Sequence, residues 1–372
     1  MLINNTEFTA LWEGESNSSP DSLKSISIID QRVLPHQIKI IELTSSIAII
    51  DAISYMLVRG APLIGVAAAY AVYFALKESI MVDDFEYFES AIDGIMASRP
   101  TAVNLKWALD LVLSQINSKS SNPDKLYAAI STARKIRNFE ISNCKAIGDI
   151  GVSIIQDIYA KTHKTVNILT HCNAGWLATV DYGTATAPIY KAANLGIPIH
   201  VWIDETRPRN QGASLTAWEL SHNQIPHTLI ADNAGGLLMM QNKVDLVIVG
   251  ADRVASNGDT ANKIGTYLKS LAAFEHSVPF YVALPSSSFD FSLESGNSIS
   301  IEERSEDEIK YIQGIDKGII RKVLICPEET SAYNPGFDIT PAKFITGFIT
   351  EQGIYPPSKI SELESIDIEQ YS

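Results

Sequence analysis

The stretch Val166-Asn-Ile-Leu-Thr170, followed at once by His171-Cys-Asn-Ala-Gly175, decides the fold class of this chain. A short apolar and β-branched run that ends abruptly in polar residues is typical of a buried strand. Five similar runs alternate with helical segments further along, at residues 197–203, 227–231, 244–250, 278–284 and 322–326. This alternation predicts βαβ units, and hence an α/β fold with a Rossmann-like domain built on a central parallel sheet.

Polar residues cluster directly after most of these runs. The clusters occupy residues 170–175, 204–209, 232–233, 250–253 and 285–288. In open α/β sheets the ligand crevice lies at the carboxyl ends of the strands, so we expect a site along this edge. The segment 286–300, rich in Ser, Gly and Asn, is expected to be a mobile loop.

The first 160 residues are expected to be mainly helical. Apolar residues spaced by three and four predict helices over 47–58, 61–76, 83–97, 107–117 and 124–159, after a short strand over 38–43. Residues 61–76 carry no charge, but a membrane-spanning helix needs about 20 apolar residues. A helix buried on all sides is therefore favoured. We divide the chain into a helical N-terminal domain, residues 1–160, and a Rossmann-like domain, residues 161–372.

Composition excludes several classes of protein. The chain has 372 residues, 46% of them hydrophobic, and 29 Lys+Arg against 43 Asp+Glu give a net charge of −14. Such a field disfavours nucleic acid and anionic membranes as partners, but it allows a small basic pocket. The three cysteines are far apart and form no CxxC pair, which suits a reducing cytoplasm. The N-terminus lacks the pattern of a signal peptide.

Motifs for common cofactors are missing from the sequence. It contains no GxGxxG after a strand, no P-loop, no HExxH and no GxSxG, and its histidines show no i,i+4 pairing. We therefore expect neither a metal nor an organic cofactor.

Cys172 and Asp252 are the strongest candidates for acid/base chemistry. Cys172 follows a predicted strand close to an expected helix start, where a thiol can have a lowered pKa. The alternative is a small buried apolar residue. Asp252 follows the run 244–250 at the carboxyl edge of the sheet, where a carboxyl group suits proton transfer. Its alternative is a structural carboxylate paired with Arg253 or capping a helix.

Asp204, Glu205 and His171 are weaker candidates for a catalytic role. Asp204 and Glu205 are adjacent on a strand, so at most one faces the site, and pairing with Arg207 or Arg209 explains them at least as well. His171 stands beside Cys172, but adjacent strand residues diverge, so a thiolate–imidazolium pair is not expected.

Six motifs in register carry a resemblance to a known family. They are Arg59-Gly-Ala-Pro-Leu-Ile-Gly65, Thr170-His-Cys-Asn-Ala-Gly175, the segments 204–212, 250–253 and 257–267, and Asn334-Pro-Gly-Phe-Asp-Ile-Thr-Pro341. Over residues 28–356 the chain closely resembles the methylthioribose-1-phosphate isomerases, which are related to the regulatory subunits of translation initiation factor 2B. The resemblance implies methionine salvage, a homodimer, and catalytic roles for Cys172 and Asp252. It also implies substrate contacts, which fall on Arg59, Gly60, Ala61, Arg99, Gln211, Asn262 and Lys263.

The implied reaction needs a clamp for a phosphate dianion and an acid/base pair. We assign Asp252 to proton transfer at the ring oxygen and the C2 hydroxyl, and Cys172 to moving the proton from C2 to C1. In the alternative, a hydride shift, Cys172 orients or shields the substrate.

The 5-substituent of the substrate stays open. Trp176 and Ala187-Pro188 depart from the family's usual residues beside the predicted pocket. Isomerases of 5-deoxyribose 1-phosphate or ribose 1,5-bisphosphate would use the same machinery, although no further cationic cluster supports a second phosphate. The remaining alternative is a non-catalytic initiation factor subunit, which would have no use for an acid/base pair.

Overall fold

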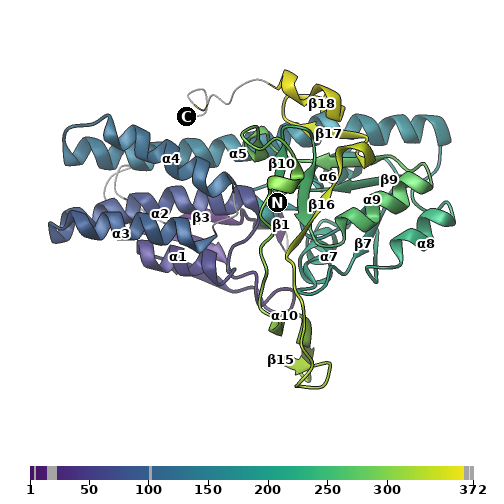
Figure 1. The fold of residues 1–372 in the computed structure, drawn as a ribbon, viewed down its shortest axis with the longest axis horizontal. Helices are drawn as coiled ribbons and strands as arrows, with labels where there is room; N and C mark the ends of the chain where they lie inside the picture. Colours follow the sequence, from purple (N-terminus) through teal and green to yellow (C-terminus); the bar gives the residue numbers. More distant parts are fainter. Residues whose placement is uncertain (4–5, 15–22, 100–102, 364–367, 369–372) are drawn as a thin grey trace.

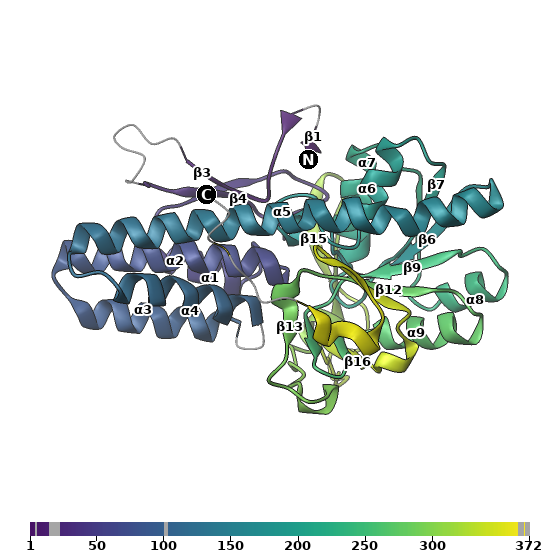
Figure 2. The same cartoon turned by 90° about the horizontal axis from the view of Figure 1, so that it is seen from above.

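The computed structural model describes residues 1–3, 6–14, 23–99, 103–363 and 368. Its N-terminal half is helical, as predicted, and is seen on the left of Figures 1 and 2. The helices are α1 (Ser46–Ser54), α2 (Ala61–Val82), α3 (Phe85–Ser98), α4 (Val103–Asn117) and α5 (Asn122–Thr162). A three-stranded antiparallel sheet of β3 (Leu11–Glu13), β4 (Ile26–Ile29) and β5 (Ile40–Leu43) lies against them.

Helix α2 is the core of this half. It is long and apolar enough to cross a membrane by composition alone, but 83% of its most apolar window is buried inside the protein. It packs against α1, α3, α4 and α5. Small residues permit this: a Cβ on Gly65 would lie 2.9 Å from the Asn104 carbonyl oxygen of α4. The prediction of a helix buried on all sides is confirmed.

The second half is a seven-stranded sheet in the order β18-β17-β12-β9-β6-β7-β8. Its strands are β6 (Val166–Thr170), β7 (Ile199–Asp204), β8 (His227–Ile230), β9 (Leu246–Val249), β12 (Phe280–Ala283), β17 (Gly347–Thr350) and β18 (Gly353–Tyr355). All neighbours are parallel except β17 and β18. Five of the six predicted strands are therefore confirmed.

Helices cover both faces of this sheet. Figure 2 shows α5, α6 (Ala187–Asn194) and α7 (Ala217–His222) on one side, with α8 (Gly235–Met240) and α9 (Thr266–Glu275) on the other. The α/β fold class with a Rossmann-like sheet is thus as the sequence predicts.

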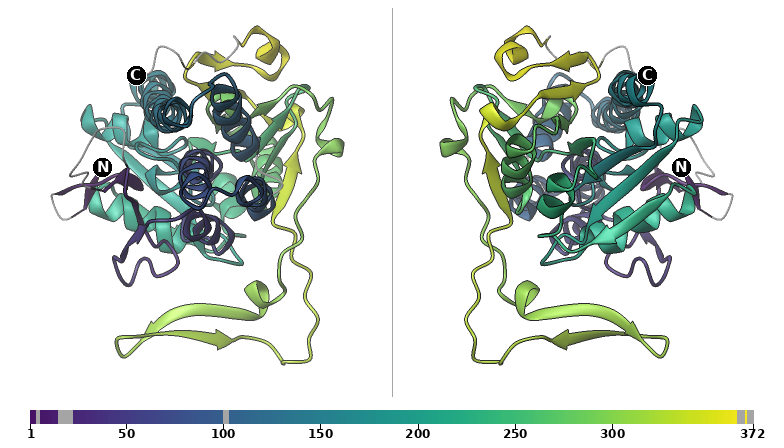
Figure 3. Two further views of the ribbon diagram at one scale, coloured as in Figure 1. Left: turned by 90° about the vertical axis from the view of Figure 1, so that its left-hand side faces the viewer. Right: turned by 90° about the vertical axis from the view of Figure 1, so that its right-hand side faces the viewer.

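The sixth predicted strand does not join the sheet. Residues 322–326 fall at β15 (Ile319–Leu324), which pairs antiparallel with β14 (Tyr311–Asp316) in a hairpin that projects from the body (Figure 3). The tip residues Lys317 and Gly318 both have positive φ, 48° and 80°. That turn matches the twist of a two-residue hairpin, so the strand pairs with its neighbour in sequence.

The expected mobile loop over 286–300 is in part packed. Ser286, Ser287 and Ser288 are buried, and Asn104 of α4 hydrogen-bonds to Ser287 and Ser288. Short hydroxyl side chains fit this junction because the amide satisfies them. The segment then runs into β13 (Phe289–Asp290) of a small sheet, in the order β13-β10-β11-β16 with β10 (Arg253–Ala255), β11 (Thr260–Lys263) and β16 (Phe337–Thr340).

One helix reaches across both halves. Helix α5 has 41 residues, so it is about 60 Å long at 1.5 Å per residue. It packs against α2 and α4 in the helical half, and against α6 and β17 in the sheet half. The division of the chain at residue 160 stays a prediction.

Candidate active site

Cys172 lies just beyond the carboxyl end of β6. Its φ of 66° turns the chain sharply after the strand, and the Thr206 hydroxyl accepts its backbone N–H at 2.8 Å. The thiol is buried and faces Gln211 Oε1 at 3.4 Å. A strained backbone at a strand end is a common feature of functional sites.

The thiol is not activated in the way the sequence suggested. Burial raises the pKa of Cys172, and this effect outweighs the opposing charges of Arg59 and Lys263. The nearest following helix is the short turn Trp176–Ala178, which begins four residues later. Cys172 is therefore a neutral thiol near pH 7.

Asp252 lies between β9 and β10, at the same edge. Its backbone N–H donates to the Ala261 carbonyl at 3.0 Å, which fixes it beside β11. Burial raises the pKa of its carboxyl group, although Arg99 and Lys263 act in the opposite direction. Arg253, the expected partner in the structural alternative, forms an ion pair with Asp290 at 3.3 Å.

Arg59 and Gly60 introduce α2 into the site. The Arg59 side chain is buried, and its Nη1 and Nη2 donate to Asn173 Oδ1 at 2.5 Å and to the Asn173 carbonyl at 2.7 Å. Gly60 has a φ of 96°, and a Cβ there would lie 2.2 Å from the Ala178 carbonyl oxygen. Glycine is required because the helix start touches the backbone that follows β6.

Arg99 and Lys263 bring further positive charge. In the described part of the chain, Arg99 Nε and Nη1 are buried without hydrogen-bond partners, and Glu302 lies 3.7 Å from Nη2. Lys263 is buried on β11, with Nζ 5.5 Å from the centroid of the Phe337 ring. Burial lowers the pKa of Lys263 and of Arg99. Unpaired buried donors of this kind suit an anion.

The nine predicted site residues come together. One small cavity is lined by Arg59, Gly60, Ala61, Cys172, Asp252 and Asn262, and a second by Gly60, Ala61, Arg99 and Asp252. Gln211 contacts the thiol, and Lys263 acts electrostatically on both Cys172 and Asp252. The first cavity measures about 40 Å³. Ligand pockets are usually several hundred Å³, and a neighbouring cavity of about 700 Å³ shares Arg59 and Gln211 with this site.

Comparison with known proteins places this chain in a family. The model of the initiation factor 2 subunit family matches residues 57–357. The chain belongs to this family. It is 52% identical over 338 residues to the methylthioribose-1-phosphate isomerase of Desulfosudis oleivorans, covering 90% of this chain and 92% of that one. It is 51% identical to the isomerase of the same name from Sulfurimonas denitrificans, covering 93% and 95%.

Solved structures agree. The 5-methylthioribose 1-phosphate isomerase of Pyrococcus horikoshii has a TM-score of 0.80 at 36% identity, covering 96% of this chain and 97% of that one. The eIF-2B subunit delta of A. fulgidus has a TM-score of 0.76 at 34% identity, covering 95% and 98%. The resemblance to this isomerase family, and the expectation of an enzyme, are confirmed.

For this family member two of the three weaker catalytic candidates, His171 and Asp204, have structural partners. His171 Nδ1 lies 2.8 Å from Asp204 Oδ2, and its Nε2 lies 2.8 Å from the Ile264 carbonyl oxygen. Asp204 also pairs with Lys269 at 3.1 Å, so Arg207 and Arg209 are not its partners. His171, Asp204 and Asp232 are close enough to hold a metal ion, but the Lys269 ammonium already supplies a cation to Asp204 and to the Asp232 carbonyl.

Two departures from the family pattern do not line the cavity. Ala174, Ala178, Thr184 and Pro285 are among the residues of its wall, whereas Trp176 is buried outside it and Ala187-Pro188 begin α6. These departures were expected beside the pocket, but only residues close to them in sequence, such as Ala178 and Thr184, line it.

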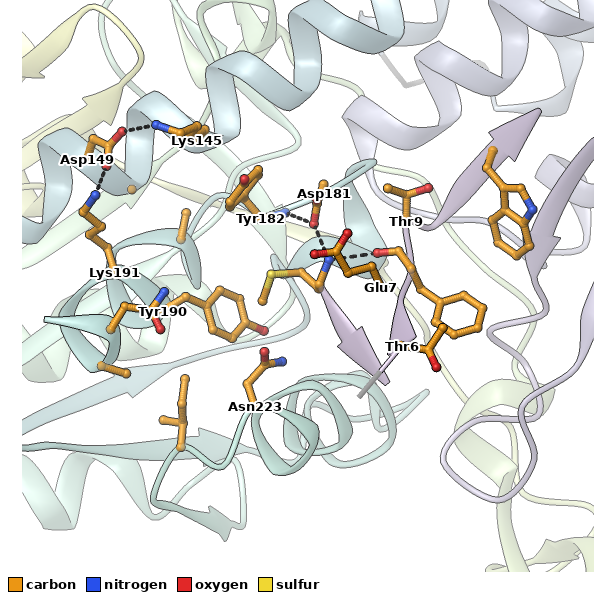
Figure 4. A pocket seen from close by; sticks show the side chains of 18 residues that line it. Thr6, Glu7, Thr9, Lys145, Asp149, Asp181, Tyr182, Tyr190, Lys191 and Asn223 are labelled. Atoms are coloured by element: carbon orange, nitrogen blue, oxygen red, sulfur yellow. Dashed lines mark hydrogen bonds and ion pairs between the residues drawn. The ribbon is translucent and has the colours of Figure 1, made fainter. Parts of the chain in front are cut away.

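A larger cavity lies away from this site. It measures about 730 Å³ and is lined by Met1, by β2 (Thr6–Glu7), which pairs with β1 (Leu2–Ile3), and by α5 and α6. Figure 4 shows Lys145, Asp149, Tyr190 and Lys191 on its wall. Neither Cys172 nor Asp252 reaches it.

Sequence analysis missed the residues that support Arg59. Asn173 stands inside a recognised motif but was given no role, and Glu219 lies in the segment Thr216-Ala-Trp-Glu-Leu220, which carries no signal. Only contacts between distant segments bring Glu219 to Asn173, at 2.9 Å.

Proposed function

We propose that the protein is an aldose–ketose isomerase that converts 5-methylthioribose 1-phosphate to 5-methylthioribulose 1-phosphate, with Cys172 and Asp252 as the acid/base pair. The observation that carries this proposal is that both residues line one buried cavity, together with Arg59. Relatives about 50% identical over nearly their whole length carry the name of this isomerase. Methionine salvage, a cytoplasmic location and a homodimer belong to the same proposal.

The phosphate group meets the cationic side of the site. The first residues of α2 provide backbone N–H groups and the positive end of the helix dipole, and Arg59 and Arg99 flank them. Lys263 adds charge from β11. A sugar 1-phosphate held here would present its C1 and C2 toward Cys172 and Asp252.

Asp252 completes the oxygen chemistry. In its protonated form it donates a proton to the ring oxygen as the bond from C1 to that oxygen breaks, which leaves a carboxylate. The carboxylate then takes the proton of the C2 hydroxyl as the ketone forms, so Asp252 returns to its starting state. The raised pKa of Asp252 favours the protonated starting form.

The hydrogen on C2 must also move to C1. In the acid/base route, the thiolate of Cys172 removes it as a proton and returns it to C1. In the second candidate route, it moves with its electron pair as a hydride to the electron-poor C1, and Cys172 shields the path. The acid/base route requires Cys172 to lose its proton in the substrate complex, against the raised pKa of this buried thiol, because a neutral thiol is a poor base.

One part of the cavity wall suits an uncharged 5-substituent. Ala174, Ala178 and Pro285 are apolar there, whereas Asn173, Thr179 and Thr184 line the polar part of the same wall. A second phosphate would need additional cations, so a methylthio or methyl group fits better than the bisphosphate.

A proton NMR time course in deuterated water tests the proposal. We expect conversion of 5-methylthioribose 1-phosphate to the ketose by the wild-type chain, and its loss in Cys172→Ala and Asp252→Asn. Deuterium at C1 would identify the acid/base route, and retained protium would leave the hydride route or a proton transfer shielded from solvent. No turnover of this sugar or its 5-deoxy analogue by folded protein would overturn the proposal and favour an initiation factor role.

A further inference from the structure

Glu219 is a fully buried carboxylate that is linked through Asn173 to Arg59. Arg59 and the N-terminus of α2 form the phosphate clamp of the proposed function. Glu219 lies on α7 with no exposed surface. Four donors surround it: Asn173 Nδ2 at 2.9 Å, the backbone N–H groups of Trp176 and Leu177 at 3.1 Å each, and the Tyr190 hydroxyl at 2.8 Å. A buried carboxylate with this many donors is held in one orientation.

The local backbone leaves room for this carboxylate. A Cβ on Gly175 would lie 1.8 Å from Glu219 Oε2, so only glycine lets the carboxylate reach the N–H groups that follow. Tyr190 donates from the other side, where it also forms part of the wall of the cavity in Figure 4.

Glu219 is connected to Arg59 by hydrogen bonds through the side-chain amide of Asn173. Because the Asn173 NH₂ group donates to Glu219 Oε1, its Oδ1 must face the other way, where it accepts from Arg59 Nη1. In the described part of the chain, Arg59 has no carboxylate within 4 Å, and Asn173 links its guanidinium to the carboxylate of Glu219. Flipping the amide would set a donor against a donor.

Glu219 is also connected to Gly60, through the backbone of residues 176–178. Glu219 fixes the turn Trp176–Ala178 by its two N–H groups, and the Ala178 carbonyl at the end of that turn packs against Gly60. Both connections therefore end at the start of α2.

We propose that Glu219 is a positioning residue that orients the phosphate clamp, holding the Arg59 guanidinium through Asn173 and the α2 N-terminus through the turn Trp176–Ala178. This role rests on the proposed function of that clamp. Glu219 itself touches no substrate.

Glu219→Gln keeps the size of the side chain but replaces an acceptor oxygen with a donor. We expect the dissociation constant of inorganic phosphate and the KM for the sugar phosphate to rise about tenfold, with kcat changed less than about threefold, since the hydrogen bonds to this carboxylate are charge-assisted. Tyr190→Phe, which removes one donor and keeps the carboxylate, should raise the phosphate constant about threefold.

Glu140→Gln is the matched control, because Glu140 is equally buried on α5 and hydrogen-bonds to Ser287. Its phosphate constant should stay within about twofold of wild type. A phosphate constant unchanged in folded Glu219→Gln, or in Tyr190→Phe if the first variant does not fold, would overturn the proposal.

A crystal structure of the variant separates this inference from the proposed function. If wild-type protein fails to bind phosphate or to turn over the sugar, the proposed function is lost. The contact of Arg59 Nη1 with Asn173 Oδ1 still reports on Glu219: its loss in Glu219→Gln supports the positioning role, and its retention contradicts it.

Discussion

The helical half and the sheet half contribute different groups to the site. The helical half supplies Arg59 and Arg99, which flank the rigid start of α2. The sheet half supplies Cys172 and Asp252, whose pKa values are both raised by burial. Under the proposed function, the arginines that recognise the phosphate come from the helical half and the proton-transfer groups from the sheet half, which also supplies Lys263 to the phosphate. The two roles should be separable by mutation.

The largest effect should come from the sheet half. Asp252→Asn removes the proton donor while keeping the shape, so kcat should fall about 10²–10⁴-fold with KM nearly unchanged. Steady-state kinetics on the sugar phosphate measure both. A comparable rise in KM would place Asp252 in substrate binding as well and blur the division between the two regions.

Arg59→Met should have the opposite signature. It removes a buried guanidinium but keeps the length of the side chain, so KM should rise about 10–100-fold with a smaller change in kcat. Inhibition by inorganic phosphate should weaken in parallel. A selective loss of kcat would move Arg59 from recognition to chemistry.

The pH profile sharpens the assignment of Asp252. Its carboxyl group is the acid in the first step and its pKa is raised, so kcat/KM should be constant below that pKa and fall as pH rises through it. The decline should be about tenfold per pH unit. A rise toward the raised pKa of Cys172 would instead identify a thiolate base.

Gly60→Ala tests how tightly the two halves meet. The new Cβ would lie 2.2 Å from the Ala178 carbonyl at a φ of 96°, which should cost about 2–4 kcal/mol of unfolding free energy. Gly318→Ala is the control, with a φ of 80° but nothing within 4 Å, and should cost about 1 kcal/mol. Urea unfolding gives both values, and equal costs would mean that the contact between the halves yields easily.

Measured per pH unit, the smallest effect concerns Glu140, where α5 meets the segment after β12. Burial, with the charge of Glu351, raises its pKa to about 8. The folded state then holds a proton that the unfolded state releases, so wild-type stability should decline as pH rises from about 4.5 to 8, at most about 1.4 kcal/mol per unit. Glu140→Gln should remove this part of the slope in urea midpoints at pH 6, 7 and 8.

Local sequence patterns predicted most helices and strands, whereas contacts between distant segments decided which strands pair with one another. The uncharged run 61–76 and the strand Val166–Thr170 were legible because their patterns are strong. Strand β17 (Gly347–Thr350) was missed because four residues beginning with glycine carry little signal, and it becomes a strand by pairing with β12. The strand at 322–326 was misplaced because hairpin pairing through Lys317-Gly318 and sheet pairing look alike in sequence.

The site shows the same limit. Motifs brought Cys172 and Asp252 into view, but a thiol pKa depends on burial from all sides, which a strand-end position does not reveal. Glu219 escaped for a related reason, since its meaning comes from Asn173, 46 residues earlier in the chain.

Helix α5 ties the stability of one half to the other. Its 41 residues bury Ile130, Ala133 and Ile136 near one end and Gly151, Val152 and Ile155 near the other. Unfolding of its middle turns would expose apolar side chains in the helical half and in the sheet half at the same time. The chain should therefore melt in a single cooperative transition, and amides of the central turns of α5 should exchange with solvent only when the whole molecule unfolds.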